Sequence, residues 1–237
     1  MQANVIARTI DHTILKAEAT AGDVRTVVAE AIRYEFSSVC VNPYFVRLVS
    51  DLLEHSPAAE KVKTCAVVGF PLGVNKTTTK AIEASSCVKD GAQEVDMVVN
   101  LPALLSGDFN EVRQDIMEVV RASRAVWPQV KVKVILETAV LNETQIALGC
   151  RAAQEGGADF VKTSTGFHPK GGATVQAVTW LRKYAGPMQV KASGGIRDLA
   201  GALAMLQAGA DRLGCSAGVA IVEAAQGQTP QAPGAGY

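Results

Sequence analysis

The chain has 237 residues, of which 48% are hydrophobic and 19% are charged, as is typical of a globular protein with a large apolar core. Its 23 lysines and arginines balance its 23 aspartates and glutamates, which argues against a general nucleic-acid binder, since such proteins carry a basic excess. The first residues lack the apolar core of a signal peptide, and no run reaches the roughly 18 apolar residues of a membrane helix. We therefore expect a cytoplasmic protein that binds neither membrane nor nucleic acid.

Five cysteines are scattered along the chain without any C-x-x-C pair. Their odd number and their spacing predict reduced thiols, most of them buried as small hydrophobic side chains. The three histidines lie far apart and lack the spacing of metal ligands, so a metal site is not expected.

Short β-branched runs alternate with alanine-rich amphipathic stretches along the whole chain. The runs predicted as strands are 5–11, 37–42, 62–70, 94–100, 130–138, 158–164, 188–193 and 211–216. The stretches predicted as helices include 21–35, 77–92, 109–126 and 143–158. Three helices end in DGA, GGA or AGA just before the next strand, and the glycine there predicts a left-handed C-cap.

Eight strand-then-helix units without an interior linker predict an α/β protein with a single (β/α)8 TIM barrel over residues 1–226. A doubly wound open sheet would alternate in the same way. It would normally carry a glycine-rich dinucleotide loop after its first strand, and IDHTILKAEAT has none. The barrel is therefore favoured. Residues 227–237 are rich in glycine, proline and glutamine and predict a flexible tail.

Four charged side chains are predicted to point into the barrel, where the active site lies at the carboxyl ends of the strands. Because neighbouring strand residues face opposite sides, Asp96 points inward from EVDMVVN, and the same alternation places Lys133, Lys162 and Lys191 inside. A lone strand lysine more often lies at an edge, and a lone interior aspartate is often a structural acceptor. Because each isolated buried charge costs several kcal/mol, a group of them is not expected for packing alone.

Neighbouring lysines favour Schiff-base chemistry. Two ammonium groups about 4 Å apart repel by roughly 4 kcal/mol at an effective dielectric constant of about 20. A second, protonated lysine would therefore help the first to lose its proton and add to a carbonyl carbon, while Asp96 would move protons at the reacting carbons. The repulsion does not decide which lysine reacts. Lys162 is preferred because three hydroxyl side chains, at 163–165, follow it.

Turns rich in glycine and hydroxyl groups follow the last three predicted strands. They are TSTG (163–166), SGG (193–195) and GCSAG (214–218), and the last leads directly into a predicted helix. Backbone N–H groups and a helix N-terminus bind phosphate well, and barrels often place a phosphate site after strands seven and eight. Tight turns without a ligand are the alternative, but three of them together favour phosphate binding.

Segments along nearly the whole chain resemble the class I deoxyribose-phosphate aldolase family. They include IDHTILK, SVCVNP, VVGFPLG, GAQEVDMVVN, VKVILET, GADFVKTSTGF and VKASGGIR, with GCS near the end. The resemblance implies a TIM-barrel aldehyde-lyase of deoxyribose phosphate catabolism. It would cleave the phosphosugar 2-deoxy-D-ribose 5-phosphate reversibly to D-glyceraldehyde 3-phosphate and acetaldehyde through a lysine Schiff base. No metal or organic cofactor is implied.

The resemblance also implies a set of site residues. Lys162 is the Schiff-base lysine, Lys191 the second lysine that eases its deprotonation, and Asp96 the proton-relay acid. The implied phosphate contacts are Gly166, Gly194, Gly195 and Ser216, with Thr165 beside them. Asp11 and Thr13 are implied near the sugar hydroxyls, Cys40 lines the pocket, and Lys133 is a further interior lysine. The chain departs from the family pattern at His168-Pro169-Lys170 and at Ala217, where some relatives have a second serine, so the phosphate contacts of these turns are less firmly implied.

Two expectations and two rival functions complete the sequence-based interpretation. Tyr237 on the tail could fold over the barrel mouth and assist proton transfer, although an idle end is an equal alternative. A homodimer is expected because barrels of this size often dimerise. The rivals are another Schiff-base aldolase, of the transaldolase or keto-acid type, and a non-catalytic phosphate-binding barrel.

Overall fold

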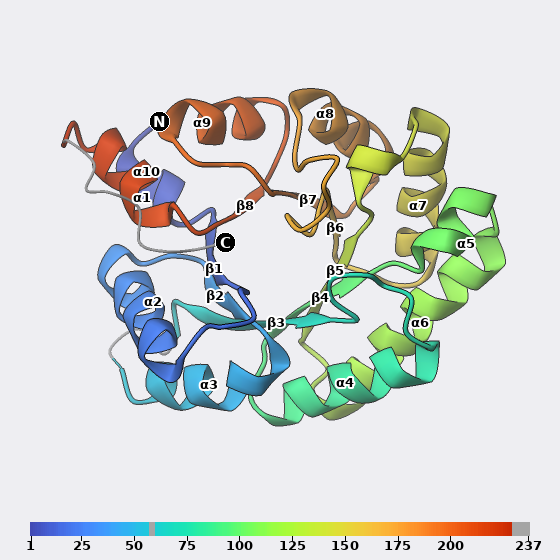
Figure 1. Cartoon of the computed structure of the whole chain (residues 1–237), viewed down its shortest axis with the longest axis horizontal. Helices are drawn as coiled ribbons and strands as arrows, with labels where there is room; N and C mark the ends of the chain where they lie inside the picture. The colour runs from blue at the N-terminus through green and yellow to red at the C-terminus, as the bar shows by residue number, and fades with distance from the viewer. Residues whose placement is uncertain (57–59, 229–237) are drawn as a thin grey trace.

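The computed structural model describes residues 1–56 and 60–228. Eight parallel strands close into a barrel in chain order (Figure 1). They are β1 (Ile10–Ile14), β2 (Ser38–Val41), β3 (Lys63–Val68), β4 (Glu94–Val98), β5 (Lys131–Ile135), β6 (Phe160–Lys162), β7 (Gln189–Ser193) and β8 (Arg212–Cys215). The predicted (β/α)8 barrel is confirmed.

A ring of helices surrounds the strands (Figure 1). They are α1 (Ala3–Ala7), α2 (Ala21–Tyr34), α3 (Val46–Glu54), α4 (Thr77–Lys89), α5 (Leu101–Ser106), α6 (Phe109–Val126), α7 (Glu143–Glu155), α8 (Val175–Tyr184), α9 (Leu199–Gln207) and α10 (Gly218–Ala225), with 3-10 turns η1 (Pro43–Phe45) and η2 (Thr138–Val140). Within the described ranges, no helix combines the length and the apolar character needed to cross a bilayer.

The first strand lies further along the chain than the sequence predicts. Only the last two residues of the predicted strand 5–11 belong to it: Ala3–Ala7 is helix α1, and β1 is Ile10–Ile14. Ile6 and Ala7 are buried and Val5 is exposed, and α1 packs against α10. Because a short apolar run with one buried side fits a helix as well as a strand, periodicity alone could not separate the two.

The helix-ending tripeptides behave as predicted. Gly91, Gly157 and Gly209 have φ values of 102°, 84° and 108°, which a side chain would strain. At Gly91 a Cβ atom would also collide with the Ser50 hydroxyl. Each glycine lets the chain leave a helix and enter the next strand within a few residues, which keeps the strand starts at one level.

The strands separate two packed regions. Val95, Met97 and Val99 are buried in the large core between the strands and the helices, which confirms the predicted outward face of this segment. A small apolar group, Leu15, Cys40, Cys65 and Val67 with Phe70 against it, forms a separate cluster. Cys40 and Cys65 of this group lie against Asp96, so the barrel interior is apolar on the β2–β3 side.

Candidate active site

Charged side chains of both signs converge inside the barrel. The set consists of Asp11 from β1, Glu94 and Asp96 from β4, Lys133 from β5, Lys162 from β6, Lys191 from β7 and Arg212 from β8. Strand register aligns them, because Asp96 is the Cα partner of Lys133 and Lys162 is the Cα partner of Lys191. The prediction that Asp96 and the three lysines point into the barrel is therefore confirmed.

Asp96 is the junction of the lysines. Its Oδ2 accepts hydrogen bonds from the Nζ atoms of Lys162 at 2.8 Å and Lys191 at 2.7 Å. Its Oδ1 accepts from Lys133 Nζ at 2.7 Å and from Cys65 Sγ at 3.2 Å. Burial by itself would raise the pKa of Asp96, but the three ammonium groups outweigh burial and hold that pKa well below its usual range. The carboxylate is therefore ionised and saturated with donors.

Lys191 is held by two carboxylates. Its Nζ lies 2.5 Å from Asp11 Oδ2 and 2.7 Å from Asp96 Oδ2, and its side chain is fully buried. Burial alone would lower the pKa of Lys191, whereas Asp11 and Asp96 together raise it above its usual range. Lys191 is therefore a fixed positive charge in the resting protein.

Lys162 is the least restrained of the interior lysines. Its Nζ pairs with Asp96 alone among the described residues, and 4% of its side chain is exposed, compared with 0% for Lys133 and Lys191. Lys162 is also the last residue of β6, at the end of the strand where active sites form in this fold. It is the most exposed of the three interior lysines.

Lys162 and Lys191 are close neighbours, as the sequence-based argument requires. Their Nζ atoms lie 2.8 Å and 2.7 Å from the same oxygen of Asp96, so they are separated by no more than those two distances together. However, a carboxylate lies between them. The sequence-based estimate considered only the repulsion between the two ammonium groups. In the structure, the negative charge of Asp96 offsets part of that repulsion.

A second layer of ion pairs supports these lysines. Arg212 Nη1 contacts Asp11 Oδ1 at 2.6 Å and Glu94 Oε2 at 3.2 Å, and Lys133 Nζ contacts Glu94 Oε2 at 2.6 Å. Burial raises the pKa of Asp11, but Arg212 and then Lys191 lower it far below its usual range. The sequence analysis overlooked Glu94 and Arg212. Alternation was the available signal for Glu94, because it lies two residues before Asp96 on the same face.

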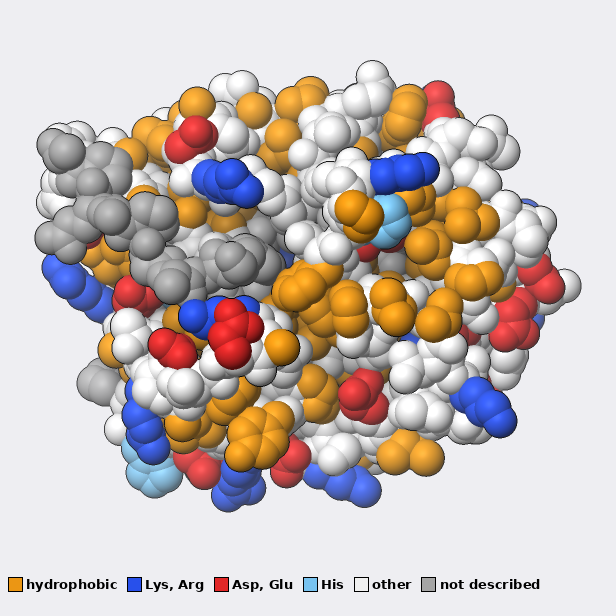
Figure 2. All heavy atoms as spheres, in the orientation of Figure 1, with side chains coloured by type: hydrophobic (Ala, Val, Ile, Leu, Met, Phe, Trp, Pro, Cys, Tyr) orange, Lys and Arg blue, Asp and Glu red, His pale blue; other side chains and the backbone are white. Residues whose placement is uncertain are grey.

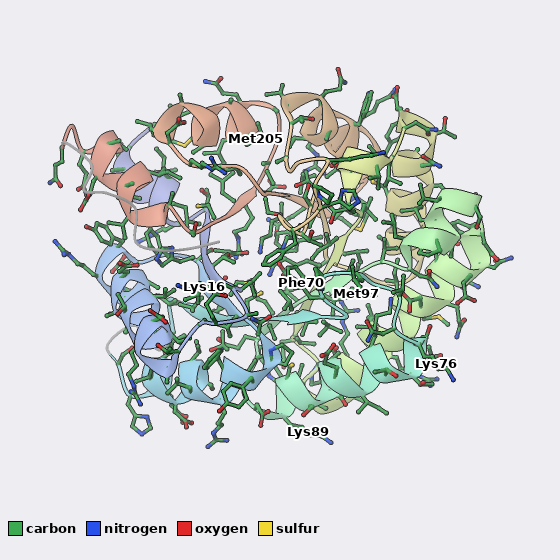
Figure 3. The ribbon with its side chains drawn as sticks, viewed as in Figure 1. Lys16, Phe70, Lys76, Lys89, Met97 and Met205 are labelled. Atoms are coloured by element: carbon green, nitrogen blue, oxygen red, sulfur yellow. The ribbon has the colours of Figure 1, made fainter. Side chains whose placement is uncertain are left out.

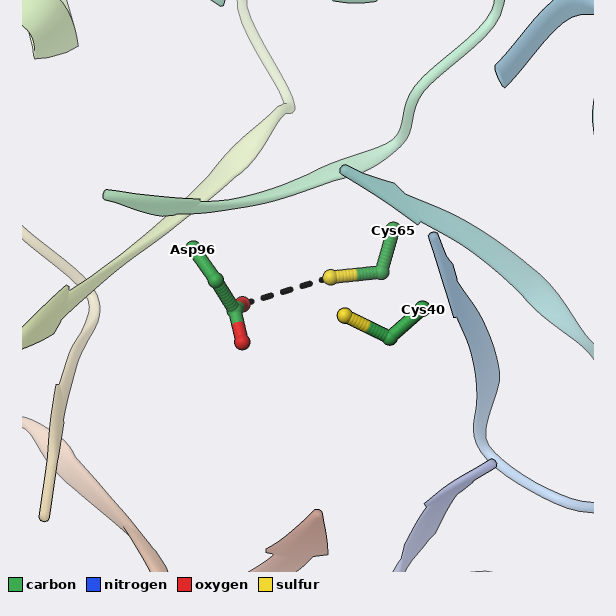
Figure 4. A group of neighbouring side chains, drawn as sticks. All are labelled: Cys40, Cys65 and Asp96. Atoms are coloured by element: carbon green, nitrogen blue, oxygen red, sulfur yellow. Dashed lines mark hydrogen bonds between the residues drawn. The ribbon is translucent and has the colours of Figure 1, made fainter. Parts of the chain in front are cut away.

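Two other predicted residues, Thr13 and Cys40, lie on the β1–β3 side of the interior. Thr13 is buried, and its hydroxyl donates to the backbone carbonyl of Asp11 at 2.8 Å. Cys40 of β2 is the Cα partner of Cys65 of β3. Both side chains point toward Asp96 (Figure 4). Cys65 was not among the predicted site residues, although its own strand alternation would have placed it inside.

The turns after β6 and β7 are joined through glycines. A Cβ atom on Gly194, whose φ is 86°, would lie 3.0 Å from Gly172 Cα and 3.2 Å from Gly166 Cα. The Ala173 N–H donates to the carbonyl oxygens of Ser193 and Gly194, both at 3.0 Å. Only glycine permits this close backbone approach, so the structure brings two of the three predicted phosphate turns into contact.

The third predicted phosphate turn leads into helix α10. β8 adjoins β7 through the pair Ser193 and Gly214, and Ser216 follows β8 directly. Ala217 is the N-cap of α10 and offers no side-chain hydrogen bond to the first turn. Gly195, with φ of 81°, is exposed and has open space around it. Backbone N–H groups therefore gather at the carboxyl ends of β6, β7 and β8, where an anion would be favoured.

Thr165 shapes the β6 turn. Its hydroxyl donates to Glu137 Oε2 at 2.5 Å and accepts from the Phe167 N–H at 3.1 Å. Glu137 is buried and has a left-handed backbone with φ of 61°. This conformation is uncommon for glutamate, and the sequence analysis gave no signal for it. Because the Thr165 hydroxyl already has a partner in each direction, its contribution to the site is the shape of the turn.

Apolar side chains rim the carboxyl end of the barrel. The Phe70 and Phe167 rings meet edge to face with centroids 5.1 Å apart, and Phe70 lies near the centre of the ring of strands (Figure 3). Leu72 and Val74 of the same loop as Phe70 are exposed. The neighbouring 168–170 loop is turned by a hydrogen bond from the Lys170 N–H to His168 Nδ1 at 3.2 Å. Tyr237 lies outside the described residues.

Comparisons with known proteins agree with this geometry. A family model described as DeoC/LacD family aldolase matches residues 5–224. The deoxyribose-phosphate aldolase of Carboxydothermus hydrogenoformans is 51% identical over 219 residues, which are 92% of this chain and 94% of that protein. That of Enterococcus faecalis is 50% identical over 222 residues, or 93% and 97% of the two chains. The tetrameric structure of deoxyribose phosphate aldolase from Aeropyrum pernix has a TM-score of 0.85 and 34% identity, covering 94% of this chain and 92% of that one.

Proposed function

The chain belongs to the DeoC/LacD aldolase family, and from this premise we propose that it cleaves 2-deoxy-D-ribose 5-phosphate reversibly to D-glyceraldehyde 3-phosphate and acetaldehyde. One observation carries the proposal: Lys162 and Lys191 share one carboxylate oxygen of Asp96 inside the barrel. This arrangement provides a nucleophilic amine, a fixed positive charge and a proton carrier at one place. The reaction class is an aldehyde-lyase acting through a lysine Schiff base.

The first step joins Lys162 to the sugar. The neutral amine adds to the C1 carbonyl of the open-chain sugar, and the proton that the ammonium group must lose passes to the carboxylate of Asp96, 2.8 Å away. The carbinolamine hydroxyl then takes that proton back from Asp96 and leaves as water, which gives an iminium ion. Lys191, which keeps its charge between Asp11 and Asp96, disfavours a second positive charge on Lys162 and so favours the reactive amine.

The second step breaks the carbon–carbon bond. The C3 hydroxyl loses its proton, the C2–C3 bond breaks, and the electron pair moves into the iminium to give an enamine while D-glyceraldehyde 3-phosphate forms. Asp96 lies beside both lysines and is placed to carry the protons between C3 oxygen and C2. Protonation of C2 and hydrolysis then release acetaldehyde and restore Lys162.

The phosphate is assigned to the turns after β6, β7 and β8. Gly166, Gly194 and Gly195 have left-handed backbones, so their N–H groups point in directions that other residues rarely adopt. Ser216 stands just before the uncapped first turn of α10, which favours a negative ligand. With the phosphate at these turns, the aldehyde end of the sugar would extend toward Lys162, which ends β6.

Two rival functions have less support. A keto-acid aldolase usually offers an arginine to the substrate carboxylate, and the interior Arg212 is already occupied by Asp11 and Glu94. A non-catalytic phosphate-binding barrel would have no use for Lys162, Lys191 and Asp96 in mutual contact, because burying such charges is costly.

The assay for this proposal measures both products. Purified protein given 2-deoxy-D-ribose 5-phosphate should release acetaldehyde and D-glyceraldehyde 3-phosphate in equal amounts. Lys162→Met should abolish release, whereas Lys183→Met, which removes an exposed lysine on α8, should leave it unchanged. Failure of the wild-type protein to form either product would refute the assignment.

We further propose that the chain is a homodimer and that Tyr237 assists proton transfer at the acetaldehyde carbon. Hydrophobic side chains gather beside the centre of the face in Figure 2, and exposed Leu72 and Phe167 are part of the surface apolar area. Light scattering on the purified protein tests the proposed homodimer, and a monomer would contradict it.

Deletion of residues 230–237 tests the proposed role of Tyr237. Unchanged turnover and unchanged solvent-proton exchange into acetaldehyde would contradict that role.

A further inference from the structure

Two cysteines face each other inside the barrel. Cys40 and Cys65 are directly paired Cα partners on the parallel strands β2 and β3. Their Cα atoms are therefore about one strand spacing, roughly 4.8 Å, apart, which is within the range that a disulfide spans. Their Sγ atoms lie within 4.8 Å of each other, and both side chains point the same way (Figure 4).

The pair differs chemically from the other cysteines. All five cysteines belong to the described part of the chain and are free and buried. Burial raises the pKa of Cys87, Cys150 and Cys215 to about 12, which keeps these thiols unreactive. The interaction with Cys65 lowers the pKa of Cys40 despite its burial, while burial and that same interaction raise the pKa of Cys65. Cys40 therefore loses its proton more easily than Cys65.

A metal ion fits this place poorly. Asp96 is the third group near the sulfurs, but both of its oxygens accept hydrogen bonds from ammonium groups. The interior set defined above holds four basic and three acidic side chains, so a cation would enter an environment with an excess of positive charge. The same excess favours an anionic sulfur.

The two buried thiols lie on the other side of the carboxylate that Lys162 contacts. Lys162 Nζ lies 2.8 Å from one oxygen of Asp96, and Cys65 Sγ lies 3.2 Å from the other oxygen. A five-carbon sugar phosphate must bring its aldehyde to Lys162, as the proposed function requires. A hydrogen peroxide molecule is far smaller than that substrate, so we expect it to follow the same route and to reach the thiols beside Asp96.

We propose that Cys40 and Cys65 form an oxidation site, at which hydrogen peroxide converts the dithiol into a disulfide that lowers aldol activity. The Cys40 thiolate attacks one peroxide oxygen, the O–O bond breaks, and a sulfenic acid and hydroxide form. The Cys65 sulfur then attacks the sulfenic sulfur, the S–S bond forms, and the sulfenic hydroxyl leaves with the Cys65 proton as water. The two sulfurs lose two electrons in total, and the peroxide gains them.

The disulfide would remove a hydrogen bond to Asp96, the proposed proton carrier. In the reduced protein, Cys65 Sγ donates to Asp96 Oδ1 at 3.2 Å and accepts from Lys133 Nζ at 3.4 Å. The disulfide has no S–H group, so Asp96 loses one of the donors that orient it. We expect turnover to fall about tenfold, since positioning errors at a proton carrier act on the chemical step, while the KM for the sugar changes little.

The test treats the purified protein with hydrogen peroxide. The expected product has lost two hydrogens, contains a peptide in which Cys40 is linked to Cys65, and regains full activity with dithiothreitol. Cys87→Ser, which removes a cysteine of α4, should behave as the wild type does. Cys65→Ser should give no cross-link, and excess peroxide should carry its Cys40 past the sulfenic acid to the sulfinic acid, which dithiothreitol does not reduce.

Several results would overturn the proposal. It is wrong if peroxide cross-links other cysteines, if Cys40 stops at sulfenic or sulfinic acid in the wild type, or if the 40–65 cross-link leaves turnover unchanged. Phenylarsine oxide gives an independent reading, because it should bind the pair once with loss of one water, and Cys65→Ser should abolish that adduct. Both mass measurements are independent of aldol activity, so they separate failure of this proposal from failure of the proposed function.

Discussion

At the scale of single residues, the positions of three lysines around Asp96 account for the chemistry. Lys133 and Lys191 are completely buried and each contacts more than one carboxylate, whereas Lys162 contacts only Asp96 among the residues that the structure describes. The proposed nucleophile therefore has fewer ion pairs than either of the other two lysines. The other two lysines help to keep Asp96 ionised and oriented.

Replacing Lys191 tests this division of roles. In Lys191→Leu, turnover should fall at least about 100-fold, which is the usual size of an acid–base contribution. Because a positive neighbour is lost, the midpoint of the pH profile for Schiff-base formation should move to higher pH. The pH profile is measured by borohydride trapping at a series of pH values, with Lys131→Leu, an exposed lysine at the start of β5, as the control. An unmoved midpoint would show that Lys191 does not act through its charge.

At the scale of elements, the turns after β6 and β7 depend on glycine for their shape. In Gly194→Ala, the new Cβ would lie 3.0 Å from Gly172 Cα, on a backbone with φ of 86°, so the two turns must separate. We expect the KM for 2-deoxy-D-ribose 5-phosphate to rise about tenfold or more, the loss of roughly one good phosphate contact. Activity toward unphosphorylated 2-deoxyribose should change little.

A second glycine variant separates the effect of the Cβ collision from the effect of backbone strain. Gly171 lies in the loop after β6 with φ of 114°, and a Cβ there meets no atom within 4 Å. Gly171→Ala therefore carries the conformational cost, about 1 kcal/mol, without the collision. Equal KM values for the two variants would contradict the proposed phosphate position.

At the scale of the whole molecule, the interior ion pairs make the free energy of unfolding depend on pH. Asp11 and Asp96 have folded-state pKa values well below the usual range, whereas in the unfolded chain they titrate near 3.9. Their stabilisation is complete above that pH and is lost as the pH falls below it, by up to about 1.4 kcal/mol per pH unit for each carboxylate.

Urea unfolding at pH 5, 4 and 3 measures that loss. The wild-type free energy of unfolding should fall steeply below pH 4, and Asp11→Asn should show a shallower fall because one of the two carboxylates no longer titrates. Asp51→Asn, which changes an exposed residue of α3, should keep the wild-type slope. A wild-type slope in Asp11→Asn would show that the interior pairs do not govern acid stability.

Much of this molecule follows from local patterns. The succession of eight strand and helix patterns predicted the barrel. Two-residue alternation within the strands predicted the inward direction of Asp96 and the three lysines, because it reports which face each side chain occupies. Other features depend on contacts between distant residues. Arg212 and Glu94 are 118 positions apart, and the left-handed conformation of Glu137 is favoured by its hydrogen bond to Thr165. The short helix α1 was mistaken for a strand because its apolar run has no decisive period.

Borohydride trapping tests the central claim most directly. The protein is incubated with acetaldehyde or with 2-deoxy-D-ribose 5-phosphate, reduced with borohydride, digested and analysed by mass spectrometry. The predicted result is one reduced adduct on Lys162, with Lys133 and Lys191 unmodified, and no adduct in Lys162→Ala. An adduct on another lysine, or one that persists in Lys162→Ala, would contradict the account.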